Sequence, residues 1–368
     1  LDQELAQRTA EVAAPTRLEE ALAALLPRLS GAYSFVLLDE HVVTGAPAPT
    51  GFPPLCLGRL PAGGWVLASE TPAYDMQQAC DTGLQTTIAV ANKIALGQIE
   101  VGIAGGTDTT SDAPIALNED LREVLLEANR QRSTTGKLKQ LAKVRPGHVV
   151  PAVPRNEEPR TGLSMGEHCA LMATQWGIPR AEQDELTVRS HENLAAAYER
   201  GFMDDLISPY LGPERDQNLR PGSSVEKLAE LKPVFGGADG TMTAANSTPL
   251  SDGASAVLLA SEDWARERDL PILAHLSEGQ TAAVDYVHKG EGLLMAPAYA
   301  VPRMLDRAGL TLQDFDFYEI HEAFAAQVLC TLRAWEDPVF CKERLGRDAP
   351  LGAIDRDKLN VKGGTVGG

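Results

Sequence analysis

Apolar and polar positions along the chain predict strands and helices of the α/β class, most clearly in the stretch from Gln77 to Asp112. Residues Leu84 to Ala95 are apolar on most sides, which predicts a buried helix. Gly97 then provides a C-terminal stop. The apolar run from Ile99 to Ala104 is short and ends at Gly105-Gly106, as expected of an interior strand. This stretch therefore predicts a helix and a strand that both lie inside the molecule.

A second strand and helix repeat this arrangement near the end of the chain. Residues Phe315 to Ile320 predict a strand, and Ala323 to Trp335 predict a buried helix. Cys80 stands just before the first helix and His321 just before the second. Because open α/β sheets gather reactive groups at the carboxyl ends of their strands, we expect both residues to face one cleft. Two more helices and a buried strand are predicted at Leu163–Trp176, Arg180–Arg200 and Ala256–Ala260.

Composition narrows the class of protein. The chain has 368 residues, of which 43% are hydrophobic, and a mean hydropathy of −0.16. These values predict a soluble globular protein of two or three domains. No apolar run approaches the roughly 18 residues of a membrane span, and the start, LDQELAQRTAEVAAP, lacks the apolar core of a signal peptide. Five cysteines without regular spacing favour reduced thiols and a cytoplasmic location.

The net charge of −18 argues against nucleic acid as a partner. The segment from Arg130 to Arg160 reverses this sign, since it holds eight Lys or Arg and two acids, a local charge of +6. Four prolines in the segment deny it a long helix. The segment is either a solvated loop or a basic docking surface for an anionic ligand, a partner or a membrane surface.

Cys80 is the first candidate for chemistry. Unpaired N–H groups and the helix dipole at a helix start favour a thiolate, which is the form that attacks. The alternative is that Cys80, like many single cysteines, is inert packing. His168 and His191 are expected to be structural, and no metal site is expected, because residue 325 is Ala where a metalloprotease helix needs a second His. The chain contains neither a P-loop nor a GxGxxG motif.

Three segments resemble motifs of the thiolases, the acetyl-CoA acyltransferases. The Gln77–Asp112 stretch resembles the region of the nucleophilic cysteine, and NSTPLSDGA at residues 246–254 is similar to the loop near the pantetheine arm. EIHEAFAAQ at 319–327 resembles the thiolase Asn-Glu-Ala-Phe motif in the His-Glu-Ala-Phe form of β-oxidation enzymes that work with an α partner. The resemblance covers residues 71–368 and implies a layered fold of two mixed sheets around buried helices.

The resemblance also implies a reaction and its residues. The reaction is acyl transfer to CoA through an acyl-cysteine on Cys80, and His321, in the position of the family's Asn, would complete an oxyanion site. The residues implied to line the substrate and CoA channel are Met165, Ser247, Thr248 and Phe324. CoA would be a co-substrate with no permanently bound cofactor. Expected partners are acyl-CoA, CoA, a second copy in a homodimer or tetramer, and the α subunit of a β-oxidation complex.

Residues 71–260 are expected to form the N-terminal thiolase domain, with an inserted loop region at 118–240, and residues 261–368 the C-terminal domain. Residues 1–70 are expected to be separate, because the part from residue 16 resembles a fragment of the glutaminase domain of amidophosphoribosyltransferase. LNVKGGTVGG at 359–368 resembles the segment just before the thiolase Gly-His-Pro motif. That motif is not in the sequence, so we expect a fold incomplete at both ends and an impaired activity.

Two other functions stay open at this point. One is an amidophosphoribosyltransferase-like protein of purine synthesis, which would need a phosphoribosyl-binding loop. The other is a catalytically inactive thiolase-like binding subunit.

Overall fold

The computed structural model describes residues 76–111, 115–152, 155–209 and 212–368, together with the backbone of 34–38, 43–47, 56–59 and 65–68. The chain divides into two compact units, Leu1–Thr86 and Thr87–Gly368. Most of the segment expected to resemble an amidotransferase lies outside the described residues.

The first unit contains two antiparallel strand pairs. Strand β1 (Ser34–Leu38) pairs with β2 (Val43–Pro47), and β3 (Cys56–Arg59) pairs with β4 (Trp65–Ala68). A short 3-10 helix, η2 (Ala79–Asp81), leads directly into helix α3, which starts at Thr82 and continues into the second unit.

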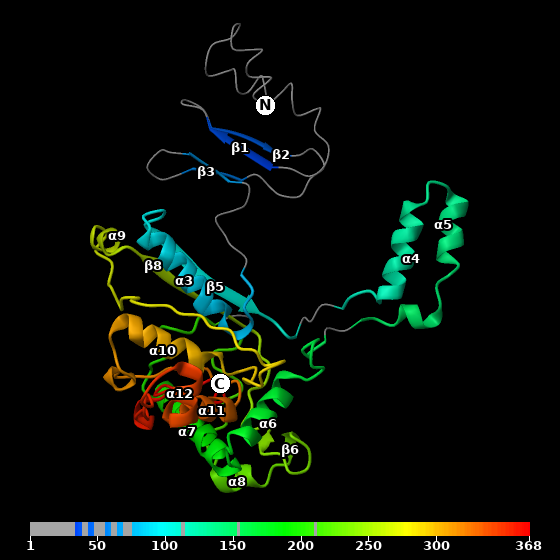
Figure 1. Ribbon diagram of the computed structural model, residues 1–368. Coiled ribbons are helices and arrows are strands. Elements are labelled where there is room, and N and C mark those ends of the chain that lie inside the picture. Colours follow the sequence, from blue (N-terminus) through cyan, green and yellow to red (C-terminus); the bar gives the residue numbers. More distant parts are fainter. Residues whose placement is uncertain are drawn as a thin grey trace. The chain divides into compact units, whose positions relative to one another are not determined.

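The second unit mixes helices and strands, as the α/β class predicts (Figure 1). Its elements are α3 (Thr82–Ala95), β5 (Val101–Asp108), α4 (Glu119–Arg130), α5 (Thr134–Leu141), η3 (Pro146–Val149), α6 (Met165–Gln175), α7 (Arg180–Glu199), α8 (Val225–Ala229), β6 (Pro233–Phe235), β7 (Met242–Thr243), β8 (Gly253–Ala260), α9 (Glu262–Arg266), α10 (Ala296–Ala308), η4 (Leu312–Asp314), α11 (Ala325–Glu336), α12 (Pro338–Leu345) and η5 (Arg356–Lys358).

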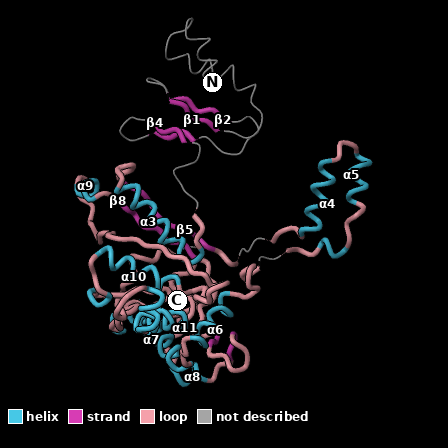
Figure 2. Tube along the Cα trace, viewed as in Figure 1, coloured by secondary structure: helices cyan, strands magenta, loops and turns pink. Residues whose placement is uncertain are grey.

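Helix α11 is the centre of the second unit. Ten of its twelve residues are buried, which is the pattern of a helix that is apolar on all sides. Its Leu329 and Cys330 pack in one core cluster with α6 and Met295, while Val328 and Leu332 pack in another with Leu305 on α10. Helices α6, α7, α10 and α12 contact α11, and Figure 2 shows α6, α7 and α10 near it. The buried helix predicted here is confirmed, although it begins at Ala325 rather than Ala323.

The prediction of a strand at Phe315–Ile320 is wrong. This segment is extended but makes only a single parallel bridge, between Tyr318 and Leu359. The Tyr318 N–H donates to the Lys358 carbonyl, and the Asn360 N–H donates to the Tyr318 carbonyl. One bridge does not make a ladder, so this segment is not a regular strand although its residues alternate as in one.

Strands β5 and β8 form a two-stranded antiparallel pair, in register from Val101 opposite Ala260 to Asp108 opposite Gly253. Among the described residues the other pairs are also two-stranded and antiparallel. Beyond the end of the pair, Asp252 Oδ1 accepts from the backbone N–H groups of Thr110 (2.8 Å) and Ser111 (3.0 Å), and these bonds lower the pKa of Asp252. Asp252 thus joins the turn after β5 to the loop before β8.

The predicted burial of α3, β5 and β8 is wrong in the described structure. No residue of α3 is buried, and Leu84 is 67% exposed. In β5 only Ala104 is buried, and Ile103 is 71% exposed. A strand is buried on both faces only when neighbouring strands and helices cover it. Here the described sheet has two strands, and α3 contacts it where Val90 meets Gly102.

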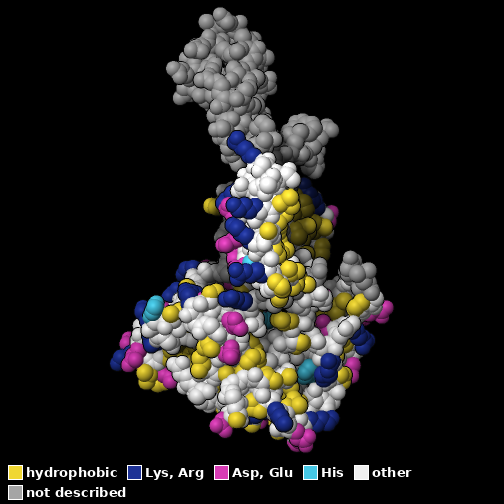
Figure 3. Space-filling view, turned by 90° about the vertical axis from the view of Figure 1, so that its right-hand side faces the viewer, with side chains coloured by type: hydrophobic (Ala, Val, Ile, Leu, Met, Phe, Trp, Pro, Cys, Tyr) yellow, Lys and Arg dark blue, Asp and Glu magenta, His cyan; other side chains and the backbone are white. Residues whose placement is uncertain are grey.

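The basic segment 130–160 begins at Arg130, the last residue of α4, and contains α5 and η3; α4 and α5 contact each other. None of these helices exceeds twelve residues, as the prolines predicted. Leu138 and Leu141 on α5 are exposed beside Lys137 and Lys139. Figure 3 shows dark-blue Lys and Arg side chains next to yellow hydrophobic ones on this surface. A docking role for the segment stays a prediction.

In the part of the chain that the structure describes, no helix combines the length and the apolar character needed to cross a bilayer.

We expect Leu329→Ala to lower the free energy of unfolding by about 2–5 kcal/mol, because it leaves a cavity in the α11 core. Leu329 is 2% exposed, whereas Leu273 is 93% exposed and provides a matched control. Leu273→Ala should change the free energy by less than about 0.5 kcal/mol. Urea denaturation followed by circular dichroism measures both values. Equal effects at the two positions would contradict the central role of α11.

Candidate active site

Cys80 occupies the turn at the start of α3, where the sequence predicted it. It is the middle residue of η2, and α3 follows two residues later at Thr82. The preceding residue, Ala79, has a φ of 49°, in the left-handed region that a non-glycine residue rarely adopts. The Thr82 hydroxyl donates to the Ala79 carbonyl at 2.7 Å and accepts from the Gln78 N–H at 2.9 Å. These bonds fix a tight turn that leaves Cys80 exposed.

Three other cysteines have a different environment. Cys169, Cys330 and Cys341 are all buried. Burial raises the pKa of the Cys330 thiol to about 12 and also raises the pKa of Cys169 well above its usual 9.0. Cys341 lies in helix α12 and not in the polar loop that its surrounding charges suggest. A thiol held in the protonated form is a poor nucleophile, so Cys80 is the best candidate among these four.

His321 lies in the extended segment that leads into α11. Its Nδ1 atom is 3.1 Å from the hydroxyl of Thr365. The ring reaches solvent, but partial desolvation lowers its pKa below the usual 6.5. The imidazole is therefore neutral at pH 7, and a neutral imidazole carries one N–H donor and one acceptor nitrogen.

The next residue, Glu322, is a buried carboxylate at the centre of a hydrogen-bond network. Ser190 on α7 donates its hydroxyl to Oε2 at 2.7 Å, and Asn360 donates its amide to Oε1 at 2.6 Å. The Ser190 oxygen accepts from the N–H groups of Gly364 (2.8 Å) and Gly367 (3.2 Å). Burial raises the pKa of Glu322 above 4.5, although its hydrogen bonds oppose that shift. A buried carboxylate requires such partners, so the network joins α7, the start of α11 and segment 360–367.

The glycines of segment 360–367 allow this close contact. A Cβ at Gly364 would collide with the carboxylate of Glu322. Gly363 has a φ of 93°, and a Cβ there would collide with Leu194 on α7. Any larger residue at these two positions would push the segment away from His321.

Ser247 and Thr248 meet the same end of α11. The Thr248 N–H donates to the Ala323 carbonyl at 3.0 Å, and Ser247 forms an antiparallel bridge with Phe324. Ser247 is buried, and its hydroxyl has no hydrogen-bond partner among the described residues. This loop therefore lies directly against the residues that follow His321.

Met165 reaches this region through Phe235. Met165 is the first residue of α6, and its neighbour Gly166 packs against the ring of Phe235. That ring also packs edge-to-face on Phe324, with centroids 6.1 Å apart. The structure thus gathers four of the predicted site residues around the start of α11: Ser247, Thr248, His321 and Phe324. Phe235 connects this region to the start of α6, where Met165 lies. Cys80 is part of the first unit.

Sequence reasoning missed the residues that support His321. Glu322, Asn360 and Thr365 lie within the motif segments, and Ser190 lies in the helix predicted at Arg180–Arg200, but the sequence does not single out any of the four. The glycine-rich sequence GGTVGG at 363–368 did indicate such contacts, because paired glycines allow the backbone to come close to another group. It did not show which group would approach.

His168 and His191, which the sequence predicted to be structural, do have structural contacts. His168 Nε2 is 2.8 Å from the Thr161 hydroxyl, and its ring packs edge-to-face on Tyr286. His191 is buried, and its Nδ1 accepts from the Arg220 N–H at 3.3 Å. Burial lowers the pKa of His191. The described residues contain no group of three or more His, Cys, Asp or Glu side chains placed to hold a metal ion.

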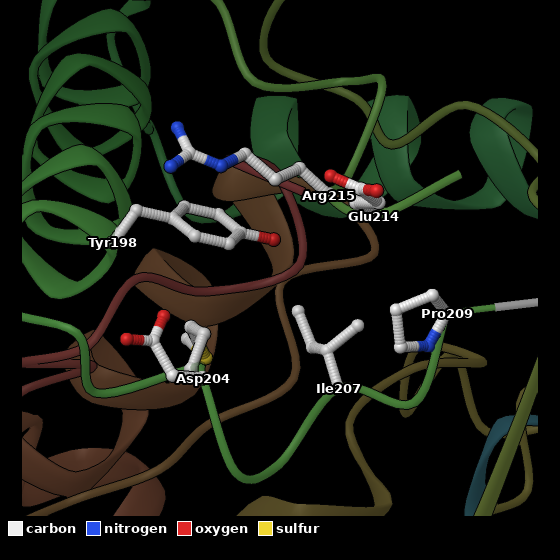
Figure 4. Close-up of a pocket in the computed structure, with 7 residues that line it drawn as sticks. Tyr198, Asp204, Ile207, Pro209, Glu214 and Arg215 are labelled. Atoms are coloured by element: carbon white, nitrogen blue, oxygen red, sulfur yellow. The ribbon is translucent and has the colours of Figure 1, made fainter. Parts of the chain in front are cut away.

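A pocket of about 290 Å³ lies beyond the C-terminal end of α7 (Figure 4). Tyr198 forms one wall, and its hydroxyl donates to Asp216 at 2.9 Å. The guanidinium of Arg215 lies over the Tyr198 ring, 5.2 Å from its centroid. None of the predicted site residues lines this pocket, so it is separate from the site around His321.

Comparison with known proteins gives the family. The thiolase N-terminal domain matches residues 55–263, and the thiolase C-terminal domain matches residues 270–367. The chain is 40% identical over 306 residues to a 3-ketoacyl-CoA thiolase of Yersinia pestis (strain Pestoides F), which covers 82% of this chain and 70% of that protein.

Two solved structures have the same fold. The acetyl-CoA acetyltransferase of Bacillus anthracis matches with a TM-score of 0.61 and 32% identity, over 80% of this chain and 67% of that one. Human mitochondrial 3-ketoacyl-CoA thiolase in complex with CoA matches with a TM-score of 0.58 and 26% identity, over 78% of this chain and 64% of that one. Together these likenesses define the class of protein as an α/β acyltransferase.

The chain belongs to the thiolase family. The predicted family and the α/β thiolase-like fold are therefore confirmed. The two mixed sheets are not seen among the described residues, where the strand pairs are two-stranded and antiparallel. The family match begins at residue 55, so residues 55–70 belong to the thiolase match rather than to a glutaminase fragment. The findings do not favour an amidophosphoribosyltransferase-like protein.

We expect Cys80 to react with iodoacetamide before Cys169, Cys330 and Cys341. Cys80 is exposed at a helix start, whereas the other three thiols are buried. Trace labelling at neutral pH followed by peptide mapping measures the order, and labelling in urea is the control that all thiols can react. Faster labelling of any buried cysteine in the folded protein would contradict this assignment.

Ser190→Ala should destabilise the protein by about 1–3 kcal/mol, because it removes one hydrogen-bond donor from Glu322 and leaves the N–H groups of Gly364 and Gly367 without their acceptor. Ser208 is exposed and has no hydrogen bond among the described residues, so Ser208→Ala is the matched control. Thermal and urea denaturation measure both variants. If the two variants were equally stable, the Glu322 network would not contribute to the fold.

Proposed function

We propose that this chain catalyses thiolysis of 3-ketoacyl-CoA, in which CoA cleaves the substrate into acetyl-CoA and an acyl-CoA shortened by two carbons. Membership of the thiolase family supports the reaction class. The observation that carries the proposal is the meeting of His321, the 247–248 loop and Phe324 at one end of the buried helix α11.

The reaction proceeds in two steps. In the first, the Cys80 thiolate attacks the 3-keto carbon, and the bond between C2 and C3 breaks. The electron pair of that bond passes to acetyl-CoA as its enolate, which takes up a proton, while the acyl group stays on the Cys80 sulfur. In the second step the thiolate of CoA attacks this thioester, so that acyl-CoA forms and the Cys80 thiolate is released.

His321 would stabilise the negative charge that develops on a substrate oxygen. A neutral N–H donor at a fixed position lowers the energy of such an oxyanion without needing to reorganise during the reaction. The lowered pKa of His321 supports this role, since it keeps the ring neutral at pH 7. Met165, Ser247, Thr248 and Phe324 would line the channel for the acyl chain and the pantetheine arm.

The partners follow from this reaction. The substrates are acyl-CoA and CoA, with CoA as a co-substrate and no permanently bound cofactor; one structural relative was solved in complex with CoA. We further propose a homodimer or tetramer that works with an α subunit of a β-oxidation complex, in the cytoplasm. The N-terminal domain is proposed to start at residue 55, where the family match begins, instead of 71 and to end at 260, with the inserted region 118–240; the C-terminal domain is proposed at 261–368.

Incubation with acetyl-CoA should leave an acetyl group on Cys80. We expect Cys80→Ser to abolish this adduct and to lower thiolysis by a factor on the order of 10³ or more, because the nucleophile is lost. Intact-protein and peptide mass spectrometry detect the adduct, and Cys330→Ala is the control that keeps Cys80. An adduct on another cysteine, or normal thiolysis by Cys80→Ser, would refute the mechanism. CoA binding without any adduct would identify an inactive binding subunit.

His321→Ala should lower kcat by roughly 10²–10³, the usual effect of removing one oxyanion donor. His321→Asn keeps a neutral N–H donor and should stay within about tenfold of the unchanged enzyme. Steady-state thiolysis kinetics at saturating substrate measure both. Equal loss in the two variants would show that His321 does not act as a neutral hydrogen-bond donor.

A further inference from the structure

The hydroxyl of Thr365 lies between two groups of the His-Glu-Ala-Phe segment. The backbone N–H of Glu322 donates to Thr365 Oγ1 at 2.8 Å. The same oxygen is 3.1 Å from Nδ1 of His321. No other hydrogen bond of the Thr365 side chain occurs in the part of the chain that the structure describes.

Accounting for the protons favours one direction for the second bond. A backbone N–H can only donate, so Thr365 Oγ1 is the acceptor toward Glu322. The second lone pair of this oxygen can accept from an Nδ1–H, but donation to Nδ1 is what gives the hydroxyl proton a partner among the described residues. A neutral imidazole accepts at Nδ1 only when its proton is on Nε2. Nε2 has no partner among the described residues, so its N–H is free to bind another group.

Hydrogen bonds on both sides of Thr365 fix its position beside His321. On one side of it Gly364 donates its N–H to Ser190, and on the other Gly367 does the same. Asn360 binds both backbone groups of Ile320, since its Oδ1 accepts from the N–H at 2.8 Å and its amide donates to the carbonyl at 2.9 Å. The segment carrying Thr365 is thereby tied to the segment carrying His321 at both ends.

The charged groups around His321 do not compete for its Nδ1 atom. Glu322 turns its carboxylate toward Ser190 and Asn360. On the facing segment, the ammonium of Lys362 lies over the ring of Phe202, 4.4 Å from its centroid. Glu319 is exposed, and partial desolvation together with the nearby Glu322 raises its pKa.

We propose that Thr365 is a positioning residue that holds His321 in the Nε2–H tautomer and so presents Nε2–H as the donor for the substrate oxygen. The part of this inference that concerns catalysis rests on the proposed function. The tautomer itself is a property of the protein without substrate. A hydroxyl at position 365 matters because residue 321 is a histidine, which has two tautomers; an asparagine has a fixed N–H donor and needs no such choice.

The tautomer can be read directly by NMR. Protein labelled with ¹⁵N at the histidine rings gives long-range ¹H–¹⁵N correlations that distinguish Nε2–H from Nδ1–H, and His321→Asn identifies the signals of His321 by their loss. At pH 8, where the ring is neutral, we expect Nε2–H in the unchanged protein and in Thr365→Ser. Thr365→Val should give a mixture or the Nδ1–H form. An Nδ1–H tautomer in the unchanged protein, or an Nε2–H tautomer that persists in Thr365→Val, would overturn the proposal.

The same samples give a second readout. A donor to Nδ1 favours the neutral ring, so Thr365→Val should raise the pKa of His321 by roughly half a unit to one unit. Ser190→Ala loosens the segment without touching the bond between Thr365 and His321. It should therefore lower stability but keep the Nε2–H tautomer. If Ser190→Ala and Thr365→Val changed the tautomer equally, Thr365 would have only a structural role.

A double-mutant cycle tests the catalytic part. Thr365→Val should lower kcat about tenfold when residue 321 is His, but less than about twofold in the His321→Asn background. A purely structural role predicts the same loss in both backgrounds and would overturn the proposal. If the tautomer behaves as expected but no variant shows thiolysis, the proposed function fails while the role of Thr365 in fixing the tautomer stands.

Discussion

The second unit depends on the complete burial of helix α11. A helix that is apolar on all sides gains free energy only when other elements cover every face. Helices α6, α7, α10 and α12 provide that cover, and the two core clusters meet along α11. Because His321 and Phe324 directly precede this helix, the position of the candidate site is set by the most tightly packed element of the unit.

Glu322 adds a polar constraint to this apolar core. Its carboxylate is buried within three residues of α11, and desolvation of a charge is costly unless hydrogen bonds replace water. Ser190 and Asn360 provide those bonds, and small residues such as Gly364 are required beside them. The same bonds bring Thr365 to His321. One buried carboxylate therefore links packing to the chemistry of the neighbouring ring.

The family relationship and the described geometry support the same site by different arguments. Likeness to thiolases gives the reaction class, for which Cys80 at its helix start is the proposed nucleophile. The geometry shows which thiols are buried, and it gathers the loop at Ser247 and the side chain of Phe324 beside His321. Neither argument depends on a bound metal, because the proposed steps need only a thiolate and hydrogen-bond donors.

The sequence by itself determined the local features: the family motifs, Cys80 before its helix, and the buried helix after His321. These follow from residue periodicity and from motif order, which are properties of neighbouring residues. Only the tertiary structure showed the exposure of α3 and β5, since burial depends on which elements cover a surface. It also decided the partners of Glu322 and His321. Ser190 and Glu322 are 132 residues apart in sequence, and no local pattern specifies a hydrogen bond over that separation.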